Sequence, residues 1–141
     1  MKKYLLIICC LTLMGCQTST YLSHVDHKMY TNLELQGVNI DHPVGNYKKP
    51  VSRLATILLS FLPGGGRFYL AFGKAKDRSQ ISGIFEDILF YPLSIFFAGQ
   101  TGRYAEDINR RELLYYYMFD EEGKQELEKA GISLTNQCKV K

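Results

Sequence analysis

The fold is decided by residues 52–66, which read SRLATILLSFLPGGG. The large apolar side chains in this stretch recur every three or four positions, at Leu54, Ile57, Leu58, Phe61 and Leu62. This spacing places them on one face of an α-helix. Ser52 is a good helix N-cap, and the proline and three glycines at 63–66 end the pattern. The stretch therefore predicts a helix that begins just after Ser52 and ends before the glycines.

A second apolar block covers residues 81–99. Its apolar side chains fall on one helical face, and Glu86 and Asp87 lie on the opposite face. Such a separation is typical of a helix that lies on an apolar surface. Pro92 is expected to kink or end this helix, and the glycines at 99 and 102 are expected to form the next turn.

The third block, residues 103–119, is predicted to be the longest helix. Asp120 then resembles the N-cap of a short helix that ends at Ala130 with a glycine stop. We therefore expect a mainly α fold in which residues 51–131 form a small domain of three to four helices. Residues 132–141 are polar and are predicted to be a C-terminal tail.

The segment before this domain, residues 16–50, has the composition of a flexible tether. Its first residues are small and polar, and its last ten are rich in residues that favour turns: Pro43, Gly45, Asn46 and Pro50. Such residues favour turns and extended chain. A loose alternation of apolar and polar residues over 28–40 also allows a short strand.

The amino terminus reads MKKYLLIICCLTLMGC. Two lysines precede an apolar run of about a dozen residues, which is typical of a secretion signal and short for a membrane-spanning helix. The end of the run, Leu13-Met14-Gly15-Cys16, resembles the lipobox of bacterial lipoproteins. This resemblance implies that residues 1–15 are removed and that Cys16 is the lipid attachment site. The new amino terminus would also carry a fatty acid such as palmitate.

The residue after the cysteine governs sorting in this class of lipoproteins. Gln17 stands there, rather than the aspartate associated with retention in the inner membrane. The resemblance therefore implies a lipid-anchored protein of the bacterial envelope, on the periplasmic face of the outer membrane rather than the inner membrane.

The charge and cysteine content limit the partners. Without the two lysines of the signal, 15 basic residues face 14 acidic ones, and a nearly neutral chain is not expected to bind nucleic acid. Cys138 is the cysteine that would remain free. We expect it to be inert or to pair between chains.

A second resemblance concerns residues 54–97. An apolar helix, the sequence Pro63-Gly64-Gly65-Gly66-Arg67-Phe68-Tyr69-Leu70 and a second apolar helix with an acidic residue are similar to the transmembrane-two domain. That resemblance implies a membrane hairpin. The first helix is short for a bilayer crossing, and charges lie within the second. A compact helical domain and an amphipathic hairpin on the bilayer surface therefore stay open as alternatives.

The sequence offers few groups for catalysis or metal binding. Glu86 and Asp87 diverge by about 100° on a helix, so a solvated face, or ion pairs with Arg103, Arg110 or Arg111, is the simpler interpretation. No phosphate-binding glycine loop and no G-x-S-x-G nucleophile motif is present. We therefore expect no enzymatic activity and no cofactor.

The histidines do not suggest a metal site either. His24, Asp26 and His27 offer three ligand types, but they lie in the predicted tether, and His42 is the remaining histidine. Metal sites need three or four convergent ligands. We expect no metal.

An interaction site is predicted in the third helix, where Tyr115, Tyr116, Tyr117, Met118 and Phe119 are consecutive. Five consecutive large residues cannot all face one side of a helix. Either alternate rings pack in the core, or the tyrosines and Phe119 form a surface that contacts a partner.

Three functions follow. The first is a non-enzymatic envelope lipoprotein, an accessory or interaction subunit that binds another envelope protein through its aromatic residues. The second is a bilayer- or lipid-engaging module in which the two apolar blocks form a membrane hairpin. The third, an enzyme, would need a cavity that gathers Glu86, Asp87 and arginines. The sequence favours the first.

Overall fold

The structure, a computed structural model, describes residues 22–91 and 93–132, and these ranges contain helices and no strand. The prediction of a mainly α fold is confirmed. The α-helices of the described residues are α2 (His24–Leu35), α3 (Arg53–Leu59), α4 (Gly65–Phe72), α5 (Ile81–Leu89), α6 (Ala98–Phe119) and α7 (Glu121–Lys129). Two 3₁₀ turns, η1 (Arg78–Gln80) and η2 (Leu93–Phe97), precede α5 and α6.

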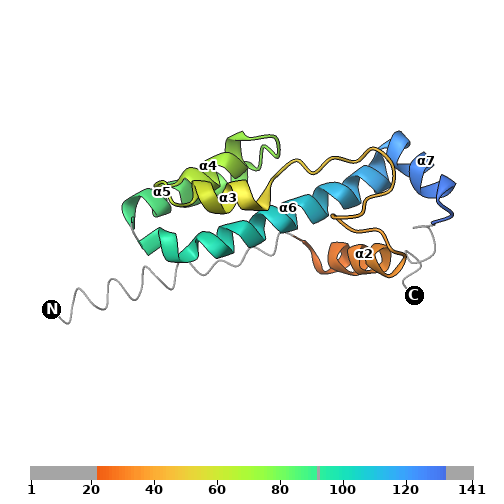
Figure 1. Cartoon of the computed structure of the whole chain (residues 1–141), viewed down its shortest axis with the longest axis horizontal. Helices are drawn as coiled ribbons and strands as arrows, with labels where there is room; N and C mark the ends of the chain where they lie inside the picture. The colour runs from red at the N-terminus through yellow and green to blue at the C-terminus, as the bar shows by residue number, and fades with distance from the viewer. Residues whose placement is uncertain (1–21, 92, 133–141) are drawn as a thin grey trace.

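Helix α6 is the long axis of the molecule, and the other helices lie along its two halves (Figure 1). Helices α3, α4 and α5 gather at its amino-terminal half, whereas α2 and α7 lie at its carboxyl-terminal half. Residues 53–102 are called the apolar lobe below. Residues 23–47 and 113–132 are called the tyrosine lobe.

Helix ends follow the local sequence. Ser52 caps α3 by accepting a hydrogen bond from the amide of Ala55, as predicted. Asp120 caps α7, and this helix ends in a Schellman motif with Gly131 at a φ of 74°. In that motif the amide of Ile132 donates to the carbonyl of Leu127.

Three local predictions need correction. Residues 51–131 contain five α-helices in their described part, rather than three to four, because the run after the glycines is itself helix α4. The longest helix begins at Ala98, so the glycines at 99 and 102 lie inside a helix and not in a turn. At Gly102, contacts on the buried side of α6 offset the low helix propensity of glycine, whereas Gly99 is exposed in the first turn of the helix.

The prediction of a tether is wrong for the described residues between 22 and 50, and so is that of a short strand over 28–40. Ser23 and Asp26 form a reciprocal capping box that starts α2. Tyr30 and Leu33 on α2, and Val38 after it, are buried against α6 and α7. These few apolar side chains fold the segment, although its composition is that of a loop. Residues 16–21 lie outside the described residues.

Tyrosine hydroxyls attach the irregular segment 36–50 to the helices. The Tyr117 hydroxyl donates to the carbonyl of Val44 and accepts from its amide, both at 2.8 Å. The Tyr30 hydroxyl accepts from the amide of Ile40, and Tyr47 donates to the carbonyl of Asn109. Tyr117 and Tyr30 therefore satisfy backbone groups of a segment without regular structure, and Tyr47 attaches the same segment to the backbone of α6.

A small cluster joins the two lobes. Val51, Leu70, Ala105 and Ile108 are buried together there. Beside them, the side chain of Asn109 donates to the carbonyl of Val51 at 2.9 Å and accepts from its amide at 3.2 Å. This pair of bonds fixes the start of α3 against the middle of α6.

Candidate functional site

The apolar lobe exposes its large apolar side chains. Fourteen of them are exposed, and they come from α3, α4, α5, η2 and the turns between them: Leu54, Leu58, Phe61, Leu62, Phe68, Phe72, Phe85, Ile88, Leu89, Phe90, Tyr91, Leu93, Phe96 and Phe97. Phe96 reaches 83% exposure. The apolar stripe that predicts α3 is therefore largely on the outside of the molecule.

The interior of the same lobe is built from small residues. Leu70 is the one large apolar side chain among its described residues that is fully buried. Most of the other buried positions hold glycine, alanine, serine or threonine: Thr56, Ser60, Gly64, Gly66, Ala71, Gly83, Ser94, Ala98, Thr101 and Gly102. The lobe thus reverses the usual distribution of large apolar side chains in a water-soluble domain.

The small residues allow the helices to approach closely. A Cβ atom at Gly66 would lie 2.0 Å from Ser60 Oγ and 2.9 Å from the carbonyl oxygen of Thr56, so α4 packs directly on the end of α3. A Cβ atom at Gly102 would lie 2.7 Å from Ile57 Cγ1, which brings α3 equally close to α6. Helix packing through small residues is typical of proteins in membranes.

Three of the four buried hydroxyls of this lobe are satisfied within their own segment of chain, whereas Ser94 Oγ has no hydrogen-bond partner in the described part of the structure. Thr56 donates to the carbonyl of Ser52, and Ser60 donates to the carbonyl of Thr56, each at 2.8 Å. Thr101 donates to the carbonyl of Phe97. Because these bonds run back along the same turn, the three hydroxyls need no water to pair with.

The phenylalanines define the size of the exposed surface. All eight phenylalanines of the chain are exposed, and seven of them belong to the apolar lobe. At roughly 200 Å² for each ring residue, the seven alone expose on the order of 800 Å². The largest contiguous apolar patch of a monomeric soluble protein is about 300–600 Å², so the summed exposed area of these seven rings exceeds one ordinary patch.

The apolar lobe carries eight charged side chains, and one ion pair between two of its helices is partly buried. Arg67 Nε lies 3.2 Å from Asp87 Oδ2, between α4 and α5. Burial raises the pKa of Asp87 above its ordinary value, and the nearby Arg67 opposes this shift. The sequence suggested Arg103, Arg110 or Arg111 as partners of this acidic pair, and that suggestion is wrong for Asp87. Glu86 is exposed and forms no ion pair in the described part.

None of the helices in the two described ranges is long and apolar enough to cross a membrane.

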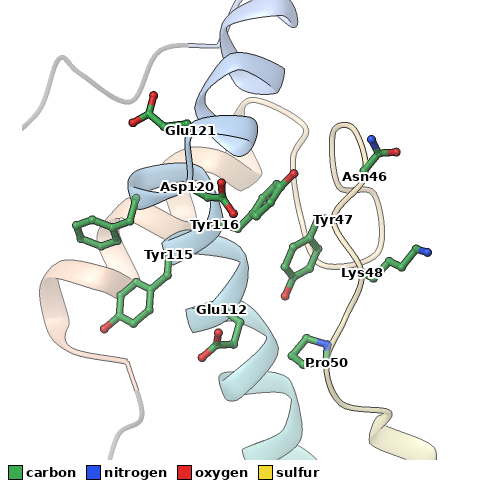
Figure 2. Close-up of a pocket in the computed structure, with 10 residues that line it drawn as sticks. Asn46, Tyr47, Lys48, Pro50, Glu112, Tyr115, Tyr116, Asp120 and Glu121 are labelled. Carbon is green, nitrogen blue, oxygen red and sulfur yellow. The ribbon is translucent and has the colours of Figure 1, made fainter. Parts of the chain in front are cut away.

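A groove in the tyrosine lobe contains most of the predicted interaction residues. It has a volume of about 780 Å³, and Figure 2 shows its residues. The segment before α3 supplies one wall, and the end of α6 with the start of α7 supplies the other, through Asn46, Tyr47, Lys48, Pro50, Glu112, Tyr115, Tyr116, Phe119, Asp120 and Glu121. Tyr115 and Phe119 are exposed, and their rings meet edge to face at 5.7 Å.

The prediction that Tyr117 belongs to an interaction surface is wrong. Tyr117 is 1% exposed and lies in the core of the tyrosine lobe with Leu113 and Leu114. Tyr116 is half-buried, and its hydroxyl donates to Glu126 at 2.9 Å. Burial, together with this bond, raises the pKa of Tyr116 to about 12.

Other candidate residues are not brought together. The described residues contain no group of three or more histidine, cysteine or acidic side chains that could hold a metal. His27 contacts the hydroxyl of Thr31 within α2, and Asp26 is engaged in the capping box. Cys16 and Gln17, the predicted lipid attachment and sorting residues, lie outside the described residues, as does Cys138.

Sequence reasoning missed the small-residue interior of the apolar lobe. The sequence does contain a signal for this interior, namely the small residues Thr56, Ser60 and Gly66, which face one another in the structure. The large apolar residues between them form the stripe from which the helix was predicted. Small residues at a spacing of four along an apolar helix mark a packing face when the surroundings are apolar.

No protein-family model, no curated protein and no solved structure matches this chain.

Proposed function

We propose that this chain is a lipid-anchored envelope protein of non-enzymatic role whose apolar lobe lies in the lipid bilayer. One observation carries this proposal: large apolar residues face outward from the apolar lobe while small residues fill its interior. The amino-terminal sequence supports it independently, because the lipobox-like Leu13-Met14-Gly15-Cys16 would hold the chain at a membrane.

The distribution of exposed residues favours lipid over a single protein partner. The outward phenylalanines come from α4, α5, the 3₁₀ turn η2 and the residues that follow α3 and α5, so they do not share one helix face. Lipid chains can cover a surface of any shape. At about 25 cal/mol per Å², removal of on the order of 800 Å² from water would contribute on the order of 20 kcal/mol, before the costs of ordering.

The test uses the absence of tryptophan from the natural sequence. Phe96→Trp and Phe119→Trp each introduce a single fluorophore at an exposed phenylalanine, 83% and 69% exposed, in the apolar and the tyrosine lobe respectively. The full-length variants are reconstituted with phospholipid vesicles that carry bromine on their acyl chains, which quenches nearby tryptophan.

We expect strong quenching and a blue-shifted emission for Trp at position 96, and weak quenching at position 119. Equal quenching at the two positions, or an emission at 96 typical of water, would overturn the proposal. The comparison is internal, because both variants carry the same amino terminus.

Two further substitutions test the lipid attachment site and the choice between outer and inner membrane. Cys16→Ser is expected to abolish lipid labelling of the protein in cells and to leave the precursor uncut. Gln17→Asp is expected to move the protein from the outer toward the inner membrane in fractionated cells. An unchanged distribution would contradict the outer-membrane assignment.

The groove of the tyrosine lobe favours a second function, that of an interaction subunit that binds another envelope protein. Tyr115 and Phe119 are exposed at its edge, and aromatic residues are enriched at the centres of interfaces. A crosslinked pull-down compares the wild type with Tyr115→Ala/Phe119→Ala. Recovery of the same proteins with both baits would exclude the groove as their binding site.

A further inference from the structure

We propose that the loop between α4 and α5 binds the anionic headgroups of phospholipids through Lys74, Lys76 and Arg78. This inference rests on the proposed insertion of the apolar lobe in a bilayer, and it adds the chemistry of the lipid and the depth of insertion. All three basic side chains are exposed. In the part of the chain that the structure describes, none of the three forms an ion pair.

Two basic residues, one just before α3 and one at its start, already have partners, whereas the exposed Lys48 forms no ion pair in the described part of the chain. Lys49 pairs with Asp41, and Arg53 pairs with Glu106. The loop therefore holds a local excess of three positive charges whose electrostatic attraction is not already satisfied within the described chain. Exposed cations of this kind near a membrane surface attract anionic lipids.

The loop is held in a defined shape. The amide of Asp77 donates to the carbonyl of Leu70, and its carboxylate accepts from the amide and the hydroxyl of Ser79. Asp77 is itself buried and lies 3.8 Å from the guanidinium of Arg111 on α6. The acidic residue is thus turned inward, while the basic residues on either side of it remain outside.

The position of the loop agrees with the thickness of one leaflet. The contact between Asp77 and Arg111 places the loop 13 residues beyond Ala98, where α6 begins. At 1.5 Å per residue this is about 20 Å along the helix. Half of a bilayer with its headgroups is also about 20 Å thick. With α6 along the membrane normal, the beginning of α6 reaches the bilayer centre when the loop lies among the headgroups.

The neighbouring aromatic residues fit this arrangement. Phe68 and Phe72 stand on the last turns of α4, just before the loop, and their rings lie 4.7 Å apart. Both are exposed. A chain that leaves the hydrocarbon core passes first through an apolar region and then through charged headgroups. Apolar rings followed by lysines match this order.

The test compares two double substitutions that remove the same charge. Lys74→Gln/Arg78→Gln alters the loop, and Lys28→Gln/Lys129→Gln alters two exposed lysines of the tyrosine lobe. Both are made in the full chain carrying the Phe96→Trp reporter. Binding is measured on vesicles of phosphatidylcholine alone and on vesicles that also contain phosphatidylglycerol.

We expect phosphatidylglycerol to strengthen binding of the reporter protein, and the loop variant to lose on the order of tenfold of its binding to those vesicles. The loop variant should bind pure phosphatidylcholine like its parent, and added salt should reduce the difference on anionic vesicles. The control variant should retain nearly all of its binding.

Equal losses in the two variants, or binding that does not respond to phosphatidylglycerol, would overturn the headgroup assignment. The reporter separates this failure from that of the proposed function. If the tryptophan at position 96 is quenched by brominated chains but binding does not depend on anionic lipid, the proposed insertion stands and the headgroup site is overturned. An unquenched tryptophan on vesicles that bind the protein overturns insertion, and a protein that binds neither vesicle overturns both.

Discussion

The two lobes of this protein use opposite rules of packing along a single helix. The carboxyl-terminal half of α6 buries Leu113, Leu114 and Tyr117, as a water-soluble domain does. The amino-terminal half of the same helix buries Ala98, Thr101 and Gly102, and the large residues nearby face outward.

Under the proposed insertion, this difference reflects the solvent of each lobe rather than its secondary structure. Both lobes are helical, and both close most of their backbone hydrogen bonds within helices. In water, burial of large apolar side chains is the main source of stability. In lipid that source is absent, and close packing through small residues takes its place. A chain that follows both rules is suited to stand at the boundary between the two solvents.

The largest effect is expected from a truncation in the core of the tyrosine lobe. Leu114→Ala removes a side chain with 0% exposure and leaves a cavity, so we expect a loss of about 2–5 kcal/mol in the free energy of unfolding. Leu35→Ala, at a position with 80% exposure, is the matched control. Chemical denaturation in a mild detergent measures both, and similar losses would contradict the assigned core.

In the apolar lobe, replacement of a small buried residue by a larger one should lower the free energy of unfolding. Gly66→Val adds atoms where a Cβ would already meet Ser60 Oγ at 2.0 Å, so we expect a loss of about 1–3 kcal/mol from strain between α3 and α4. Gly99→Val is the control, because nothing lies within 4 Å of the added Cβ there. If both variants unfold at the same denaturant concentration, the close approach at Gly66 is not a source of stability.

Asn109→Ala tests the pair of hydrogen bonds that fixes Val51 against the middle of α6, between the two lobes. This change leaves the amide and carbonyl of Val51 without their partners in a buried position, at a cost of about 1–3 kcal/mol. Asn46→Ala, at an exposed position, is the control. Limited proteolysis next to α3 should become faster in the first variant, and an unchanged rate would mean that Val51 is held by its apolar contacts alone.

Alkaline pH should destabilise the tyrosine lobe selectively. The pKa of Tyr30, Tyr47, Tyr116 and Tyr117 is raised above the ordinary value of 10.0, mainly by burial. Because the folded state holds these protons more tightly than the unfolded state, their contribution to stability is full below pH 10. It falls as the pH rises from about 10 to 12 and beyond.

Helix content followed against pH measures this effect. Tyr116→Phe should weaken the decline in stability between pH 10 and 12, since the pKa of Tyr116 is about 12 in the folded chain. Tyr115→Phe removes a hydroxyl from an exposed side chain and is the control. A decline of the same steepness in both variants would assign the alkaline transition to other groups.

The smallest effect on stability is expected at the most exposed phenylalanine. Phe96→Ser should change the free energy of unfolding in detergent by no more than about 0.5 kcal/mol. It should nevertheless weaken retention on vesicles, whereas Phe119→Ser should weaken it less. A large loss of stability in detergent would show that Phe96 packs inside the protein.

The sequence predicted the helical elements better than their surroundings. Ser52, Asp120 and Gly131 mark helix ends through local chemistry, and all three predictions are confirmed. The fold of residues 24–50 could not be read locally. Its few apolar residues become meaningful through partners far along the chain, such as Val44 with Tyr117.

The candidate site shows the same limit. Periodicity correctly places Leu54, Leu58 and Leu62 on one face of the chain around α3, but it does not say whether that face meets protein, water or lipid. The run of tyrosines was equally ambiguous, and in the structure Tyr115 is exposed while Tyr117 is buried. Helix periodicity determines which residues share a face, and the neighbouring elements determine what covers it.

The long-range bonds of the tyrosine lobe have a consequence for the order of folding. The backbone amide of Asn46 donates to the carboxylate of Glu126, 80 residues away in the sequence. The Tyr117 hydroxyl donates to the carbonyl of Val44, 73 residues away. This lobe is therefore assembled from both ends of the chain, with the apolar lobe as an insertion between them. Loop closure of this length is slow compared with contacts between adjacent helices. During synthesis the apolar helices would meet one another, and any nearby lipid, before the last 20 residues arrive to close the tyrosine lobe behind them.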